Sequence, residues 1–278
     1  MDNLLRQIEA DDSQIRISAA DALGEIGESA VAPLCHALGH SKWFVRATAA
    51  YALGGIGGST AIHALCRALG DSDSSDPVGS CNVRLSAVYA LTRIGKPAVT
   101  PLCEVFDHGE KEARWMASSA LGKIGDISTI RLLCEGLGDT DGDIRACAVC
   151  ALGEIGAPAV ETLCLLILTS KDWIVRACAA NALARIRDAR AVEPLREALR
   201  RIDSPIRKLV SWAFAERIDF KSGVRQTARA SEADALRRAL GEIESHAPNK
   251  SPEPTAVGAG RSAVAVHVAS RRWLSFFR

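Results

Sequence analysis

The sequence has few aromatic residues, no excess of charge of either sign and no long apolar run. Aromatics make up 5% of the 278 residues, and 34 basic residues stand against 33 acidic ones, giving a formal net charge of +1. Nucleic-acid-binding proteins usually show a clustered basic footprint, so no nucleic-acid partner is expected. The longest apolar run, Leu163 to Leu168, is far too short to cross a bilayer, so no membrane partner is expected either.

The N-terminal sequence also lacks the features of a secretion signal. MDNLLRQIEADD is acidic and amphipathic, without a basic start or an apolar core. Nine cysteines in a chain of this kind indicate a reducing compartment. We therefore expect a cytoplasmic protein.

What the sequence does contain is a repeated unit: a branched apolar residue, an arginine and then Ala-Leu-Gly-x-Ile-Gly. Successive repeat arginines are 30, 38, 30, 31, 31 and 31 residues apart. A period in this range is typical of stacked supersecondary units. The repeat arginines are Arg16, Arg46, Arg84, Arg114, Arg145, Arg176 and Arg207.

Each repeat reads as two helices when positions are counted from its arginine as zero. Apolar residues at −1, +3, +6, +7 and +10 form one stripe of the Arg-bearing helix. An acid at −4 suits the start of this helix, and a glycine at +11 suits its end. A second helix of the form Ala-Val-x-x-Leu-Cys-x-x-Leu follows. Since one pair cannot bury its own stripe, we predict an all-α fold, an α-solenoid of about seven stacked antiparallel helix pairs.

The repeats also predict how the chain is divided. Residues 1–218 are expected to form the solenoid, interrupted by a polar surface loop at 71–82 and closed by a degenerate capping repeat at Arg207. Residues 219–246 read as a linker followed by a C-terminal helix that starts at a capping-box-like Ser231. Residues 247–278 are expected to be a disordered tail.

The two halves of the unit resemble a known kind of repeat. Val45 to Gly57 and Ala191 to Leu195 are similar to the short HEAT-like repeats of phycobilisome (bilin) lyase subunits. The resemblance covers roughly residues 1–218 and implies a HEAT-like superhelix with the Arg-bearing helices on its concave side. It says little about activity, because such repeats occur in lyases, hydroxylases and binding scaffolds alike. A lyase-like protein would be expected to act as one subunit of a hetero-oligomer.

The repeat arginine is interpreted as a structural brace. Its position flanks the apolar stripe, so the stem can lie on the next repeat while the guanidinium pairs with the −4 acid of its own or an adjacent repeat. The alternative is a row of anion-binding arginines. The acids that recur with the arginines favour the brace.

Nothing in the sequence forms a recognisable catalytic, metal or cofactor site. Cys147-x-x-Cys150 has the spacing of a metal or redox pair, but no second such pair or paired histidine completes a zinc site. Cys147 and Cys178 share repeat position +2 and are interpreted as packing residues, although a further role stays open. We expect no catalytic residue, no metal and no cofactor. Whether the protein is an enzyme stays open: the residues favour a non-catalytic role, and an enzymatic one would be bilin-lyase-like.

The candidate binding residues lie at −3, +1 and +5, which are spaced one turn apart on the Arg-bearing helix and face away from its apolar stripe. This −3/+1/+5 row holds four of the five tryptophans and both tyrosines. Small residues between two tryptophans would form a dip with aromatic walls. The predicted partner-binding residues are Trp43, Tyr51, Tyr89, Trp115, Gly142, Ala146, Cys150, Trp173, Asn181 and Trp212.

Two functions follow from this row. Exposed tyrosine and tryptophan are typical of binding surfaces, which favours a non-catalytic scaffold that binds a protein or peptide along the concave face. The alternative, a bilin-lyase-like chromophore chaperone or transferase subunit, rests on the resemblance and has no catalytic residue mapped to it. A third possibility, that the aromatics only pack across repeat joints, also stays open.

Overall fold

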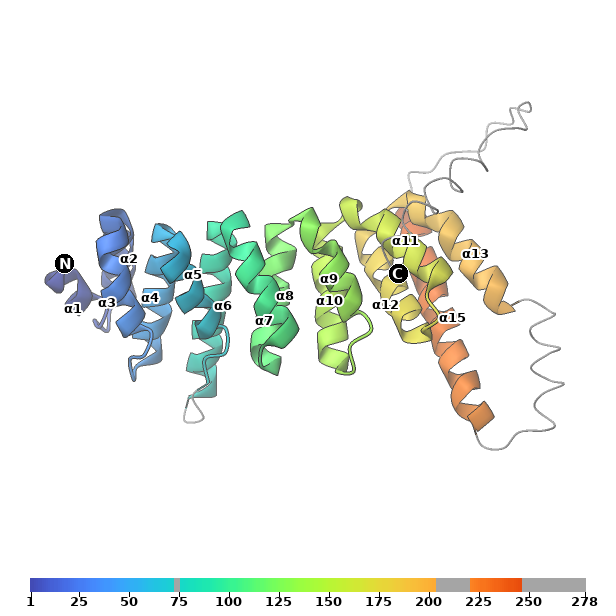
Figure 1. The fold of residues 1–278 in the computed structure, drawn as a ribbon, viewed down its shortest axis with the longest axis horizontal. Helices are drawn as coiled ribbons and strands as arrows, with labels where there is room; N and C mark the ends of the chain where they lie inside the picture. Colours follow the sequence, from blue (N-terminus) through green and yellow to red (C-terminus); the bar gives the residue numbers. More distant parts are fainter. Residues whose placement is uncertain (73–75, 204–220, 247–278) are drawn as a thin grey trace, which may run out of the picture. The chain divides into compact units, whose positions relative to one another are not determined.

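The computed structural model describes residues 1–72, 76–203 and 221–246, and all of its regular elements there are helical. Figure 1 shows the helices standing side by side in chain order, as expected for the predicted all-α solenoid, which is thereby confirmed. The Arg-bearing helices are α2 (Ser13–Ile26), α4 (Trp43–Ile56), α6 (Pro77–Ile94), α8 (Lys111–Ile124), α10 (Gly142–Ile155) and α12 (Trp173–Ile186). The second helices are α3 (Val31–Ala37), α5 (Gly58–Ala68), α7 (Val99–His108), α9 (Ile130–Gly136), α11 (Val160–Thr169) and α13 (Val192–Asp203).

Shorter and terminal elements complete the array. Helix α1 (Asp2–Gln7) precedes the first pair, and α15 (Lys221–His246) follows the last described one. Single 3₁₀ turns lead into most of the second helices. They are η1 (Gly27–Ala30), η2 (Lys96–Ala98), η3 (Ile127–Thr129), η4 (Ala157–Ala159) and η5 (Ala189–Ala191).

The predicted helix starts are confirmed where the −4 residue is aspartate. Asp12, Asp141 and Asp172 each accept a hydrogen bond from the backbone N–H two residues on, which satisfies a donor left free by helix geometry. Glu110 begins α8 without such a side-chain bond. In the lengthened repeat, Asp76 takes over this role and Pro77 opens α6.

The helix ends follow the predicted glycines. Gly57, Gly95 and Gly156, at +11, have φ of +72°, +76° and +75°, a region that side chains other than glycine rarely adopt. In the last described pair the equivalent residue is Arg187, which adopts φ of +58° without that freedom.

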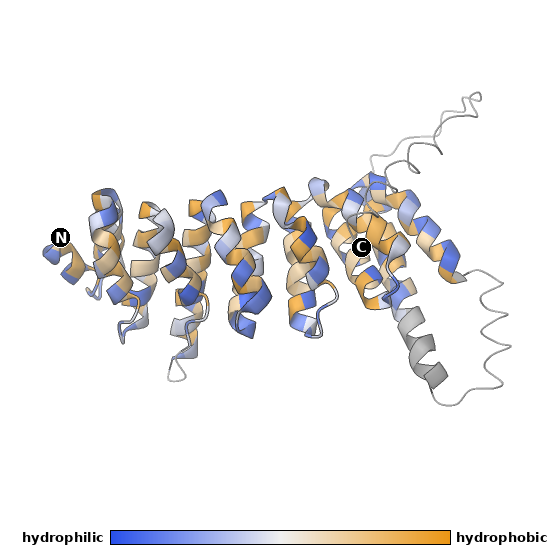
Figure 2. Ribbon diagram, in the orientation of Figure 1, coloured by the Kyte–Doolittle hydropathy of each residue, from blue (hydrophilic) through white to orange (hydrophobic). Residues whose placement is uncertain are grey.

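The core is the predicted stripe, closed by the second helices. Val45, Ala49 and Leu53 of α4 are fully buried, as is Leu34 of the preceding second helix. Each helix of the row carries both apolar and polar residues (Figure 2). Stacking of the pairs buries the apolar side of a helix and leaves its polar side in solvent. The +10 position is less enclosed than expected, since Ile56 is only half-buried.

Glycine at +8 brings neighbouring Arg-bearing helices into backbone contact, a feature that the sequence analysis did not recognise. A Cβ added at Gly54 would lie 2.6 Å from the Cβ of Ala90 on α6. A Cβ added at Gly122 would lie 2.8 Å from the Cα of Ala151 on α10. These contacts hold the Arg-bearing helices close together, so that their outer faces form one surface.

The C-terminal helix differs from the prediction. It begins at Lys221 rather than Ser231, and it packs against α12 and α13, where a further Arg-bearing helix would stand. Leu236 and Ile243 are buried in this contact, so α15 closes the apolar end of the array. The repeat expected at Arg207 and the tail at 247–278 lie outside the described residues.

Within the described ranges, no single helix is long and apolar enough to cross a membrane. By length and composition only α10 and the segment Ala157–Thr169 would suffice together, and they are bent by 113° relative to each other.

Candidate functional site

The repeat arginines are braces, but their partners differ from those predicted. Arg46 donates from Nη1 to the carbonyls of His40 and Ser41, at −6 and −5, over 3.0 Å each. Arg16, Arg145 and Arg176 make the same bond to the −6 carbonyl. The predicted pairing with the −4 acids was wrong, because those carboxylates are turned to the helix N-terminus that they cap.

A second set of bonds joins three of the braces to an acid further along the chain. Arg46 contacts Asp71 over 3.0 Å, and Arg114 contacts Asp139, in each case an acid 25 residues further along the chain. Arg176 does the same with Glu232 of α15, through two bonds of 2.6 and 2.8 Å. Glu232 is only 2% exposed, so this bidentate pair is shielded from water. The repeat arginines from Arg16 to Arg176, which the structure describes, are therefore engaged within the fold and do not form a free anion-binding row.

The cysteines are packing residues where they are buried. Burial raises the pKa of the Cys66 and Cys134 thiols to about 12 and that of Cys147 to about 11, which keeps them protonated. Cys150 is exposed, and the two cysteines of the Cys147-x-x-Cys150 pair thus differ in surroundings. In the described part of the chain, no group of three or more metal-ligating side chains is brought together.

The −3/+1/+5 row lies on the outer face of the Arg-bearing helices. Tyr89 and Trp115 are each 54% exposed, and Gly142, Ala146 and Cys150 of α10 are exposed as well. Trp43, Tyr51, Trp173 and Asn181 are half-buried, while Trp212 lies outside the described residues. Whether the small residues of α10 form a binding dip stays a prediction.

Some of these aromatics contact one another across repeats. Tyr51 of α4 and Tyr89 of α6 stack with ring centroids 5.8 Å apart and an interplanar angle of 8°. Trp43 packs so closely on α6 that a Cβ added at Gly79 would overlap its ring. Trp43 therefore serves the repeat joint, as the packing interpretation proposed, whereas Tyr89 and Trp115 keep most of their surface in solvent.

Two further residues extend the exposed apolar surface and were missed in the sequence analysis. Ile17 is 46% exposed and Leu85 is 51% exposed, both at +1. Every +1 residue from α2 to α12 is apolar: Ile17, Ala47, Leu85, Trp115, Ala146 and Ala177. The apolar character of the +1 position is visible when the repeats are aligned. The prediction considered the aromatic residues of the row and left out its aliphatic ones.

An apolar pocket of about 280 Å³ opens between α2 and α4 at one end of this surface. Ile17 of α2 and Ala47 of α4 form opposite walls, with the ring of Phe44 beside them. The Phe44 ring is held by the Arg16 guanidinium, whose Cζ lies 4.8 Å from the ring centroid. The pocket wall is thus fixed by a residue that also braces its own turn.

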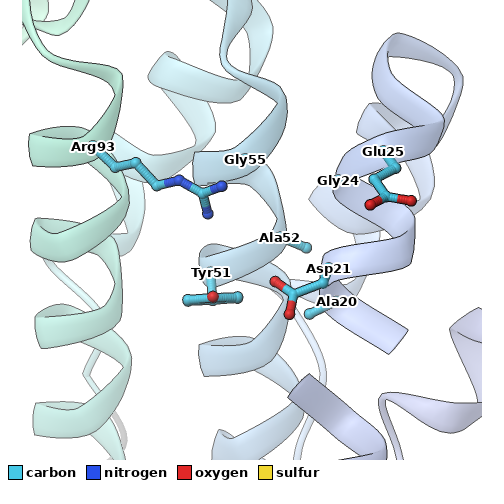
Figure 3. Close-up of a pocket in the computed structure, with 8 residues that line it drawn as sticks. All are labelled: Ala20, Asp21, Gly24, Glu25, Tyr51, Ala52, Gly55 and Arg93. Atoms are coloured by element: carbon cyan, nitrogen blue, oxygen red, sulfur yellow. The ribbon is translucent and has the colours of Figure 1, made fainter. Parts of the chain in front are cut away.

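A second, polar pocket of about 360 Å³ continues along the same two helices and shares Ala20 and Tyr51 with the first. Figure 3 shows Asp21 and Glu25 projecting from α2, while Arg93 reaches from α6 over Gly55. Within the described residues, none of these three charged groups forms an ion pair.

Tyr51 lies between the acidic residues of α2, Asp21 and Glu25, and Arg93 of α6. The Asp21 carboxylate lies near the Tyr51 hydroxyl, and the Cζ of Arg93 lies 5.9 Å from the Tyr51 ring centroid. Burial, followed by the influence of the nearby Asp21 carboxylate, raises the pKa of Tyr51, so the phenol stays neutral. The pocket therefore presents two carboxylates and one guanidinium around a neutral ring.

Comparison with known families gives a clear match. A family model for HEAT repeats matches residues 1–78, 79–149 and 130–215, well over half of the chain. This match confirms the HEAT-like resemblance read from the repeats. No match was found among the curated proteins.

Several solved structures match most of this chain. The complex of CpcE and CpcF of phycocyanin lyase from Nostoc sp. PCC7120 is 20% identical, with a TM-score of 0.36 over 86% of this chain and 93% of that one. The archaeal HEAT-like repeats protein from Thermococcus onnurineus NA1 is 12% identical, with a TM-score of 0.38 over 86% and 97%. Human deoxyhypusine hydroxylase is 18% identical, with a TM-score of 0.35 over 88% and 96%.

Proposed function

Since the chain belongs to the HEAT-repeat family, we propose that it is a non-catalytic scaffold that binds a protein or peptide segment along its concave face, on the solvent-facing side of its Arg-bearing helices. One observation carries the proposal. Large apolar side chains stand half in solvent at positions +1 and +5 of the Arg-bearing helices α2, α6 and α8, at Ile17, Leu85, Tyr89 and Trp115.

Such a surface is costly unless a partner covers it. Single exposed apolar side chains are ordinary, but several of them on one face are typical of interaction surfaces. Tyrosine and tryptophan supply large contact areas and lose little side-chain entropy when bound. The close packing of the helices at the +8 glycines keeps the row rigid, which lowers the ordering cost of binding.

The repeated motif itself does not supply the binding groups. Its arginines are bonded to turn carbonyls and to acids of the next repeat, and its apolar residues are buried. Binding is therefore assigned to positions that vary between repeats, because only these differ in chemistry along the surface.

The proposal is tested with peptides selected from a random phage-displayed library on the purified protein. Replacing Leu85 and Trp115 together by alanine should weaken binding of the selected peptides by at least about tenfold, since loss of an interface anchor commonly costs about 2 kcal/mol or more. Ile127→Ala is the matched control, because Ile127 is 66% exposed but lies between α8 and α9, off the row.

Circular dichroism should show the same helix content in all three proteins, because the exchanged side chains are exposed. Equal binding by the double variant and the control would overturn the proposal. A shift in the absorption spectrum of added bilin, lost in the same double variant, would instead favour the chromophore-chaperone alternative.

A further inference from the structure

The two pockets between α2 and α4 form one groove whose two ends differ in chemistry. The end at Ile17 and Ala47 is apolar. The other end carries the carboxylates of Asp21 and Glu25. Because both ends share Tyr51, a bound segment that fills one end passes directly to the other.

The charges at the polar end favour a cationic side chain. Asp21 and Glu25 are one turn apart on α2 and exposed, and neither forms an ion pair with another described residue. An ammonium or guanidinium group placed here gains two carboxylates as partners. The repeats further along the chain do not offer this pair, since their +5 and +9 positions hold Ser119 with Lys123 or Asn181 with Arg185.

Arg93 is the third charged residue of the polar end. Its guanidinium lies across the Gly55 floor from Glu25 (Figure 3), and Gly55 has no side chain to separate them. The guanidinium is exposed and has only donors, so an acceptor of the ligand can take the place of water there. The carbonyl oxygens of a peptide backbone are such acceptors, which a free ammonium ion lacks.

The spacing of the groove fixes the spacing of the ligand residues. Ile17 and Asp21 are four helical residues apart, a rise of about 6 Å. Side chains on one side of an extended chain repeat every two residues, or about 6.6 to 6.8 Å. An apolar residue against Ile17 therefore places the residue two positions away beside Asp21, and the long stem of lysine or arginine reaches on toward Glu25.

From this register and charge we infer that the α2–α4 groove binds an extended peptide segment in which an apolar residue and a lysine or arginine are separated by one position. The inference rests on the proposed function and names its partner class. Peptides with an acidic residue in place of the basic one bind more weakly, because like charges then meet at Asp21 and Glu25.

The test uses peptides selected on the full-length protein and measured by fluorescence anisotropy at physiological salt. The selected sequences should be enriched in an apolar and a basic residue with one residue between them. The variant Asp21→Asn with Glu25→Gln should bind them at least tenfold more weakly. Glu154→Gln is the matched control, because Glu154 is also exposed at +9 but stands on α10, and it should bind as the wild type does.

A double-mutant cycle separates charge recognition from a change in shape. Replacing the peptide's lysine by norleucine should weaken binding to the wild type, yet should have little further effect on the Asp21→Asn, Glu25→Gln variant. Equal sensitivity of both proteins to that exchange would overturn the inference.

The outcomes also distinguish this inference from the proposed function. Peptides that depend on Leu85 and Trp115 but ignore Asp21 and Glu25, or that lack a basic residue, would refute the inference and leave the scaffold function standing. A library that yields no peptide dependent on Leu85 and Trp115 would refute the proposed function itself.

Discussion

Replacing Gly54 by alanine should destabilise the protein, whereas the same exchange at Gly24 should stabilise it. Both glycines lie at +8 of an Arg-bearing helix, so both substitutions gain about 1 kcal/mol from the higher helix propensity of alanine. What differs is the space that the new methyl group would enter.

The structure gives the size of that difference. The added Cβ at Gly54 would lie 2.6 Å from the Cβ and 2.7 Å from the Cα of Ala90, so backbone has to move. At Gly24 the nearest atoms, of Ala52 and Gly55, are 3.8 Å away, which is ordinary contact. Overpacking of this kind costs about 1–3 kcal/mol. At the upper end of that range, Gly54→Ala should lose about 2 kcal/mol net, while Gly24→Ala gains about 1 kcal/mol.

Urea denaturation followed by circular dichroism measures both variants against the wild type. Thermal unfolding should agree, with Tm lowered by about 4–8 °C for Gly54→Ala and raised by about 2–4 °C for Gly24→Ala. Adding Ala90→Gly should recover only part of the loss, because the contact with the Ala90 Cα remains. If Gly54→Ala proved as stable as Gly24→Ala, the close approach of α4 and α6 described above would be refuted.

Three further predictions concern the core, the C-terminal closure and the thiols. Leu152→Ala should cost about 2–5 kcal/mol in urea denaturation, since Leu152 is fully buried between repeats, and an unchanged midpoint would place it outside the core. Glu232→Ala should lower the free energy of unfolding by about 3–5 kcal/mol, because it leaves the Arg176 guanidinium without its buried partner. Hydrogen exchange should then speed up in α15, and unchanged protection there would contradict the pairing. At pH 8, iodoacetamide should label exposed Cys150 well before Cys66, whose pKa is raised to about 12; mass spectrometry reads the order, and equal labelling would argue against the burial of Cys66.

The helices and their core could be predicted because both follow from spacing within one helix. Ala148 and Leu152 recur at fixed offsets, and those offsets define a stripe without knowledge of any neighbour. The caps were equally local, since Asp141 bonds the backbone two residues away. Core positions and helix caps of this kind depend on residues within a single repeat, so the sequence of one repeat is enough to predict them.

The bonds of the arginines could not be predicted in the same way. The acceptors of Arg46 are carbonyls of its own turn and a carboxylate of the next turn, and their positions depend on how the pairs stack. The close approach at Gly54 depends likewise on where Ala90 falls in the next helix. Each of these features joins two repeats, and a pattern within one repeat does not contain it.

The candidate site shows the same difference between features within one repeat and features that join two repeats. That Tyr89 and Trp115 face outward followed from the helical wheel, and their exposure agrees. That Trp43 instead covers Gly79 depends on the helix beside it. The polar pocket was not expected, because Asp21, Tyr51 and Arg93 come from three successive repeats and form no motif in the linear sequence.

The bond from Arg84 has a consequence for how the chain can grow. Its guanidinium donates to the Asp71 carbonyl over 2.7 Å, although Asp71 lies at −13 instead of −6, a difference of 13 − 6 = 7 residues. Since Asp71 is also the partner of Arg46, both arginines bond to a residue that follows the C-terminus of α5, whatever length of chain comes after it. The contacts between these repeats are thus set by where the helix ends and not by the number of residues between the repeat arginines. Additional sequence can enter after Asp71, natural or engineered, while the repeats on either side stay in step.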